Sequence, residues 1–314
     1  MRGLLGIGVF GVAVAMLPLF VTSGYTLNAV IMTLYAALLG QAWNILGGFG
    51  GQFSFGHAVF FGTGAYAMAV LQVKLGWNAW AALPVALALG AAVGALVGAL
   101  SFRYGLRGSY FALVTLAFAE VFRILANTFQ FTGAGVGLMV PLATSAADLQ
   151  PASRAGYLWL VLALVLAGLV VSWWLKHSRY GAWLQAVRDN EASASALGVN
   201  PFRVKLGAIV MSGALMAAGG AFYVQYLHYI DPHIAYGPAV SVEALLGPIV
   251  GGMGTVWGPL LGAGVLHLLG EATRGLMGDA PGINLVVYGA VLILMVTFLP
   301  SGIIGIFRRR LARA

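Results

Sequence analysis

The most unusual polar residues of this 314-residue sequence lie in the segment from Gly47 to His57, which reads GGFGGQFSFGH. Long apolar stretches flank the segment on both sides. A backbone that unwinds between two membrane helices leaves amide and carbonyl groups unpaired in hydrocarbon, unless protein or a watery cavity receives them. Such a break therefore lies either beside a solute pathway or inside a packed bundle. We predict a bend over Gly47 to Gly51. The candidate pathway residues are Gly50 and Gly51 of this bend and the polar side chains of Gln52, Ser54 and His57, although His57 also fits a structural role as a hydrogen-bonded helix-start residue.

A second polar site lies within the apolar segment from Ser109 to Asn127. Glu120 and Arg123 are three residues apart, so on a helix they share one face and can pair with each other. An ionisable residue inside a membrane span indicates function by default, because burying its charge is costly. We therefore include Glu120 among the candidate pathway residues, with a structural ion pair near the outer mouth as the alternative.

Metal and enzymatic chemistry find little support in the sequence. The histidines at positions 57, 177, 228, 233 and 267 are scattered, and His228 and His233 flank a predicted outer loop rather than sharing a helical face. Cysteine is absent, and the sequence contains neither a nucleophile motif nor the G-x-x-x-x-G-K-[ST] phosphate-binding loop. We therefore expect no metal, no cofactor and no catalytic site of its own.

The elements that must position these residues are membrane helices. Hydrophobic residues make up 61% of the sequence and charged residues only 8%, with a mean hydropathy of +0.94, whereas soluble domains are about a quarter charged. Several apolar runs reach the ~20 residues that cross ~30 Å of hydrocarbon. We predict an all-α integral membrane protein that forms one transmembrane domain over residues 1–314, a polytopic bundle of about eight to ten helices with glycine-interrupted segments. The candidate spans are Leu4–Val21, Leu27–Leu46, His57–Val73, Ala79–Leu100, Ser109–Asn127, Tyr157–Leu175, Leu206–Leu227, Val240–Val250, Gly258–Leu269 and Ile283–Leu299, of which the eighth and ninth are too short to cross unaided.

The basic residues predict the orientation of the bundle. With ten crossings and a cytoplasmic amino terminus, only Lys74, Arg154 and Arg274 fall outside, as the positive-inside rule expects. Both termini are then cytoplasmic. The net charge of +8 lies mostly beside helix ends, so it indicates membrane orientation rather than nucleic-acid binding.

Residues 176–205 form the largest predicted inner loop and read KHSRYGAWLQAVRDNEASASALGVNPFRVK. Asp189 fits the amino cap of a short helix, Glu191 its first turn and Gly198 its left-handed end. Asn200 and Pro201 fit the start of the next span. We predict a small helix that exposes Arg188, Asp189 and Glu191 and offers Ala192, Ala196 and Leu197 as an apolar surface. Such a helix suits docking into a groove of a soluble partner, and a solvated connecting loop is the alternative.

A second glycine break resembles the first, because Ile249 to Gly254 matches Ile45 to Gly50 at four of six positions. The pair is either a parallel internal repeat or a chance match in a glycine-rich chain. Paired interruptions point to the substrate route in transporters. Other glycines recur at four-residue spacing, as at Gly90, Gly94 and Gly98, which favours close packing of helices in lipid.

Four stretches of the sequence together resemble one known family. They are GQFSFGHAVFFGTGAYA, RGSYFALVTLAFAEVFR, RDNEASASALGVNPFRVK and GPIVGGMGTVWGPLLGA. They look like the permease subunits of ATP-driven branched-chain amino-acid importers, of the LivM type, in the same order over nearly the whole chain. The resemblance implies a multi-pass permease of the bacterial inner membrane. It further implies a LivH-type second permease, two cytoplasmic ATPase subunits and a periplasmic solute-binding protein as partners.

The same resemblance implies that residues 176–205 are the cytoplasmic coupling loop that docks on an ATPase. The candidate coupling residues are Arg188, Asp189, Glu191, Ala192 and Gly198. The general importer signature places a glycine six residues after the glutamate of its EAA motif, whereas here Gly198 is seven residues after Glu191, and the later Leu-Pro is missing. The coupling role therefore depends on the narrower family.

The function expected from these features is import of leucine, isoleucine or valine by alternating access, with ATP hydrolysed by partner subunits. The closest alternative is a permease for urea, amides or other amino acids. A further alternative is an ion-coupled secondary carrier with Glu120 as the coupling carboxylate.

Overall fold

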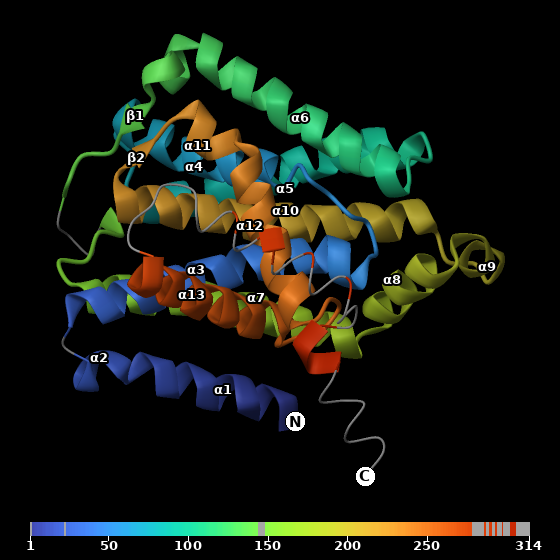
Figure 1. Cartoon of the computed structure of the whole chain (residues 1–314). Coiled ribbons are helices and arrows are strands. Elements are labelled where there is room, and N and C mark those ends of the chain that lie inside the picture. The colour runs from blue at the N-terminus through green and yellow to red at the C-terminus, as the bar shows by residue number, and fades with distance from the viewer. Residues whose placement is uncertain are drawn as a thin grey trace.

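The computed structural model describes residues 2–21, 23–143 and 148–277, together with short pieces at 286, 289–290, 293, 297 and 302–305. Figure 1 shows a bundle in which most long helices run side by side. The helices are α1 (Arg2–Ala15), α2 (Leu17–Phe20), α3 (Gly24–Asn44), α4 (Ala58–Val73), α5 (Ala79–Arg103), α6 (Gly108–Thr128), α7 (Arg154–His177), α8 (Arg179–Asp189), α9 (Glu191–Ala196), α10 (Pro201–Leu227), α11 (Pro232–Tyr236), α12 (Pro238–Gly251) and α13 (Gly258–Met277). Short 3-10 turns at Gln130–Thr132 and Ala134–Val136 precede β1 (Leu138–Met139), which pairs antiparallel with β2 (Tyr229–Ile230).

The predicted all-α membrane fold is confirmed. Within the described ranges, seven helices are long and apolar enough to cross a membrane, and α4 is a shorter apolar helix. The eighth predicted span corresponds to α11 and α12, which together cover Pro232–Gly251. The ninth is longer than predicted, because α13 continues to Met277. Most of the tenth predicted span, Ile283–Leu299, lies outside the described residues.

Helix α10 packs against α3, α4 and α5 in the middle of the bundle. Helix α12 runs across α3 and α10 rather than alongside them, and it packs on α13 (Figure 1).

Glycines allow these helices to approach backbone to backbone. A Cβ atom added at Gly94 of α5 would lie 2.8 Å from the carbonyl oxygen of Ile209 in α10, and one at Gly90 would lie 2.3 Å from the Ala217 Cβ. Between α12 and α13, a Cβ at Gly262 would lie 1.8 Å from the Gly247 oxygen. These separations are too short for a side chain, so the predicted glycine packing is confirmed.

Candidate functional site

The first glycine break follows α3 directly. Residues Ile45–Phe49 form a π-helical turn, a form of helix that is rare and is often found at functional sites. Gly51 then takes a left-handed conformation, with φ at +65°, which only glycine adopts at little cost. The chain continues without regular structure to α4. The predicted bend over Gly47 to Gly51 is therefore present.

The two glycine breaks lie against each other although they are far apart in the sequence. The Asn44 side chain, at the end of α3, accepts a hydrogen bond from the Gly254 amide at 2.8 Å. It also donates one to the Thr255 carbonyl oxygen at 3.0 Å. Asn44 is fully buried, so it satisfies backbone groups that unwinding has freed from helical pairing.

His57 is a buried structural residue in this arrangement. Its Nε2 lies 2.9 Å from the Ser212 hydroxyl, which itself donates to the Ala42 carbonyl oxygen at 2.7 Å. Since the Ser212 proton is used in that bond, Nε2–H must donate to Ser212. The Nδ1 atom of neutral His57 then accepts from Ser54, at 3.1 Å. These bonds join the first break to α3 and α10.

The segment between Gly51 and α4 alternates in the direction of its side chains. Ser54 is buried, whereas Phe53 and Phe55 are exposed. Both phenylalanines line a cavity of about 520 Å³. The other residues that line it are Ala36, Ala239, Val242, Glu243, Leu245, Leu246, Gly247, Ile249, Ala263, Leu266, His267 and Gly289.

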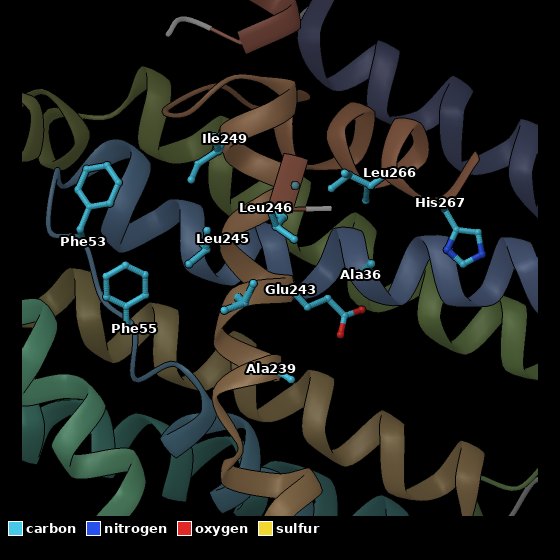
Figure 2. Close-up of a pocket in the computed structure, with 14 residues that line it drawn as sticks. Ala36, Phe53, Phe55, Ala239, Glu243, Leu245, Leu246, Ile249, Leu266 and His267 are labelled. Carbon is cyan, nitrogen blue, oxygen red and sulfur yellow. The ribbon is translucent and has the colours of Figure 1, made fainter. Parts of the chain in front are cut away.

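Figure 2 shows how α12 forms the middle of this cavity. Phe53 and Phe55 lie at one end and His267 at the other, with Glu243 projecting from α12 between them. Glu243 and His267 are the two polar side chains among the lining residues. The volume is within the ~300–1,000 Å³ typical of small-molecule sites, and a mostly apolar lining with few polar groups is also typical.

The structure does not bring the predicted pathway residues to this cavity, since Gly50, Gly51, Gln52, Ser54, His57 and Glu120 are absent from its lining. The Gln52 amide lies 3.4 Å from the Gly50 carbonyl oxygen. Glu120 forms two bonds with Arg123, at 2.5 and 2.9 Å, on the exposed side of α6. The predicted pairing of Glu120 with Arg123 is thus present.

Glu243 is the functional candidate that sequence reasoning missed. It lies inside the predicted span Val240–Val250, where an acidic residue is itself an indication of function. Glu243 is therefore a second acid in a predicted span, besides Glu120. The signal was present in the sequence, but its significance depends on the cavity, which only the packing of α3, α12 and α13 reveals.

The predicted single helix in residues 176–205 is two helices, α8 and α9. Asn190, rather than the predicted Asp189, caps α9, because its side-chain oxygen accepts from the Ser193 amide at 2.9 Å. The predicted left-handed end at Gly198 is confirmed by its φ of +85°. The start of the next span is also confirmed, since Asn200 caps α10 and Pro201 follows it.

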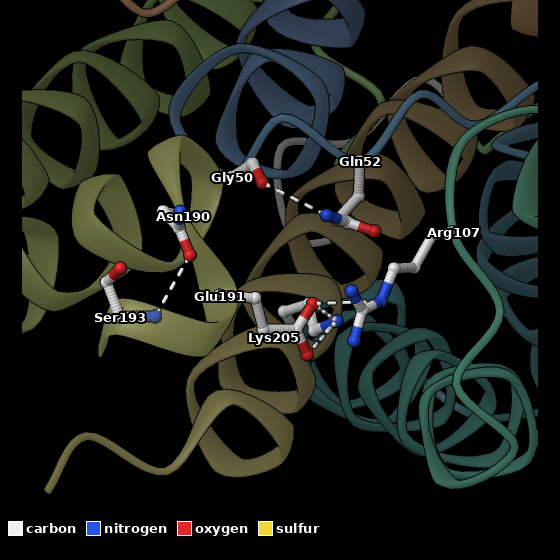
Figure 3. Close-up of polar contacts among 7 residues, drawn as sticks. All are labelled: Gly50, Gln52, Arg107, Asn190, Glu191, Ser193 and Lys205. Atoms are coloured by element: carbon white, nitrogen blue, oxygen red, sulfur yellow. Dashed lines mark hydrogen bonds and ion pairs between the residues drawn. The ribbon is translucent and has the colours of Figure 1, made fainter. Parts of the chain in front are cut away.

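Glu191 is directed into the protein, which corrects the prediction that α9 exposes it. Its carboxylate lies 2.9 Å from Lys205 Nζ and 3.2 Å from Arg107 Nε, and Figure 3 shows the three side chains converging. The Lys205 side chain is only 2% exposed and also lies over the Phe102 ring. Glu191 therefore joins α9 to α10 and to the residue that precedes α6.

Arg188, at the end of α8, reaches the glycine breaks. Its Nη1 donates to the Gly48 carbonyl oxygen at 3.1 Å, and its side chain packs on Gly51, where an added Cβ would lie 2.3 Å from Arg188 Cγ. A Cβ at Gly254, in the second break, would lie 3.4 Å from the same guanidinium. Arg188 thus connects α8 to both breaks.

The remaining residues of α8 and α9 divide into anchors and exposed groups. Tyr180 donates to the Val204 carbonyl oxygen at 2.6 Å, and burial raises the pKa of Tyr180 to about 12, so its hydroxyl stays protonated as a donor. Ala192, Ala196 and Leu197 are exposed, as predicted. Asp189 is also exposed, beside Arg188. In the described part of the chain, no group of three acidic or histidine side chains could hold a metal ion.

Comparisons with known proteins agree with the fold. The permease from Escherichia coli named high-affinity branched-chain amino acid transport system permease protein LivM is 29% identical, over 93% of this chain and 73% of that protein. The LivH permease of the same system and organism is 27% identical over 47% of this chain and 46% of LivH. The autoinducer 2 import system permease protein LsrC of Klebsiella pneumoniae is 37% identical over 33% of this chain and 31% of LsrC.

No solved structure matches the chain. The family model for the permease component of branched-chain amino acid transport systems matches residues 25–296. This match includes both glycine breaks, the helices α8 and α9 and the Glu243 cavity. The chain therefore belongs to the family of branched-chain amino acid transport system permease components.

Proposed function

We propose that this chain is a permease subunit that moves branched-chain amino acids across the inner membrane by alternating access, driven by ATP hydrolysis in partner subunits. The observation that carries the proposal is the linkage through Arg188, which joins the surface helix α8 to both glycine breaks. A force applied to α8 would act directly on the segments whose backbone is interrupted.

The partners we propose are a LivH-type second permease, two cytoplasmic ATPase subunits and a periplasmic solute-binding protein. The similarity to both LivM and LivH supports a pair of related permeases. The exposed apolar residues Ala192, Ala196 and Leu197 provide a surface on α9 for an ATPase groove. In this proposal, Arg188 connects the docking region to the glycine breaks, and Gly198 ends the docking helix. With α8 and α9 on the cytoplasmic side, both termini are also cytoplasmic.

In this proposal, Glu191 does not contact the ATPase directly. Its carboxylate is bound to Lys205 and Arg107, so it fixes α9 to the bundle. A docking helix that is fixed in this way transmits displacement better than one on a mobile loop. Asp189 remains the exposed acid that can contact a partner.

A solute other than a branched-chain amino acid is the second candidate. The similarity to LsrC, whose name gives autoinducer 2 as its solute, supports a solute of another class. Urea, amides and other amino acids belong to the same alternative. An ion-coupled carrier that uses Glu120 has less support, because that carboxylate already forms two bonds with Arg123.

The proposal is tested by purifying the full chain with its associated subunits and reconstituting them in liposomes. We expect uptake of labelled leucine to require ATP and the binding protein. Arg188→Gln should reduce uptake about tenfold without loss of assembly, because one charge-assisted hydrogen bond contributes ~1.5–3 kcal/mol. Arg179→Gln is the matched control, since Arg179 is exposed on the first turn of the same helix. Uptake that continues without any ATPase would reject the proposal.

A further inference from the structure

The cavity beside α12 contains the carboxylate of Glu243, which no side chain in the described ranges compensates. Glu243 is exposed to the cavity, and the described ranges offer it neither an ion-pair partner nor a hydrogen-bond donor. Its neighbours in the lining are almost all apolar. A carboxylate in apolar surroundings is costly unless a cation or donor compensates it.

Acids elsewhere in the described chain show what a structural role looks like. Glu120 is bound by Arg123, and Glu191 by Lys205 and Arg107. Asp231 caps α11 by accepting from the amides of His233 and Ile234. Each of these carboxylates is compensated within the protein, whereas Glu243 faces a space large enough for a small molecule.

We propose that the Glu243 carboxylate binds the ammonium group of the transported solute in this cavity, while the apolar wall receives the solute's aliphatic side chain. This inference rests on the proposed function, which makes the solute a small amino acid. Figure 2 shows the Glu243 carboxylate directed toward the His267 side, with Leu245 and Ile249 on the same helix toward Phe53. The site therefore has one charged and one apolar region, as does leucine.

The absence of cysteine from the natural sequence allows a direct test. Ala239 lines the cavity one helical turn before Glu243, so Ala239→Cys places a single thiol on the same face as the carboxylate. The purified full-length variant is treated with two methanethiosulfonate reagents, one with a trimethylammonium head and one with a sulfonate head. Ala182→Cys, at an exposed position of α8, gives the intrinsic ratio of the two rates.

We expect the ratio of the cationic to the anionic labelling rate to be about tenfold higher at position 239 than at position 182. The reason is that a nearby carboxylate attracts cations and repels anions. Adding Glu243→Gln should remove this preference, and Glu243→Asp, which keeps the charge, should retain it. Equal ratios at the two positions, or a ratio that Glu243→Gln leaves unchanged, would overturn the proposal.

Protection from labelling tests the ammonium group itself. We expect 3-methylbutylamine and leucine to slow the reaction at position 239, whereas 4-methylpentanoate, which lacks the ammonium group, should not. Protection by the carboxylic acid as strong as by the amine would contradict the proposal. If amine protection depends on Glu243 but the reconstituted complex does not transport leucine, the site stands and the proposed function fails.

Discussion

Two regions of the molecule hold paired charges, and they differ in what the pairs connect. At one end, Glu191 joins α9 to Lys205 of α10 and to Arg107, with Lys205 almost fully buried. On α6, Glu120 and Arg123 pair within a single helix, and the Glu120 side chain is 51% exposed. The charges around Glu191 link different segments of the chain, whereas Glu120 and Arg123 pair within one helix.

The presence of a charge inside a predicted span is therefore not enough to show that the residue is important. Burial and the number of segments joined determine what is lost when one partner is removed. We use the name α8–α9 cluster for the residues that connect these two helices and the glycine breaks, which are Asn44, Gly48, Arg107, Arg188, Glu191, Lys205 and Gly254. We therefore expect substitutions in this cluster to have large effects on stability and substitutions on α6 to have small ones.

The largest effect is expected for Glu191→Gln. The substitution leaves the Lys205 ammonium buried without its carboxylate, which should lower the free energy of unfolding by about 3 kcal/mol. Thermal unfolding of the purified protein in detergent, followed by tryptophan fluorescence, measures this as a lower Tm. Adding Lys205→Met should recover most of the loss, because the buried position 205 then no longer holds an uncompensated charge. An unchanged Tm for Glu191→Gln would show that the Lys205 ammonium does not depend on the Glu191 carboxylate for its compensation.

The next largest effect is expected for Asn44→Ala. It removes both hydrogen bonds between the breaks and leaves the Gly254 amide without its acceptor. The expected loss of stability is about 2 kcal/mol, read from the same Tm measurement. Asn127→Ala, at an exposed position near the end of α6, is the matched control and should have little effect. Equal losses from the two variants would mean that the breaks are held together by packing alone.

Local signals in the sequence predicted the features that depend on a few neighbouring residues. The glycine break at Gly51, the helix end at Gly198 and the helix start at Asn200 all followed from the conformational preferences of those residue types. The membrane fold followed from apolar length and composition. These properties are decided within one or two helical turns, so a single sequence is enough to predict them.

Features that depend on distant segments could not be predicted in the same way. Asn44 is 210 residues from its partner Gly254, and nothing local distinguishes it from another buried amide. Glu191 appeared exposed because a first-turn acid usually faces solvent, but Lys205 lies fourteen residues later on the neighbouring helix. The cavity around Glu243 is formed by segments from three parts of the chain. Only the packed structure brings these residues together.

The smallest effect is expected for Glu120→Gln, which makes the same chemical change as Glu191→Gln. Arg123 keeps a contact with His233, 3.4 Å from Nη1 to Nδ1, and its pair with Glu120 joins no second element. The Tm should therefore change less than for Glu191→Gln, and leucine uptake should stay ATP-dependent and close to the natural rate. A loss of uptake with an unchanged Tm would instead place Glu120 on the solute pathway. A large fall in Tm would mean that lipid surrounds the pair, since an unpaired Arg123 would then be costly.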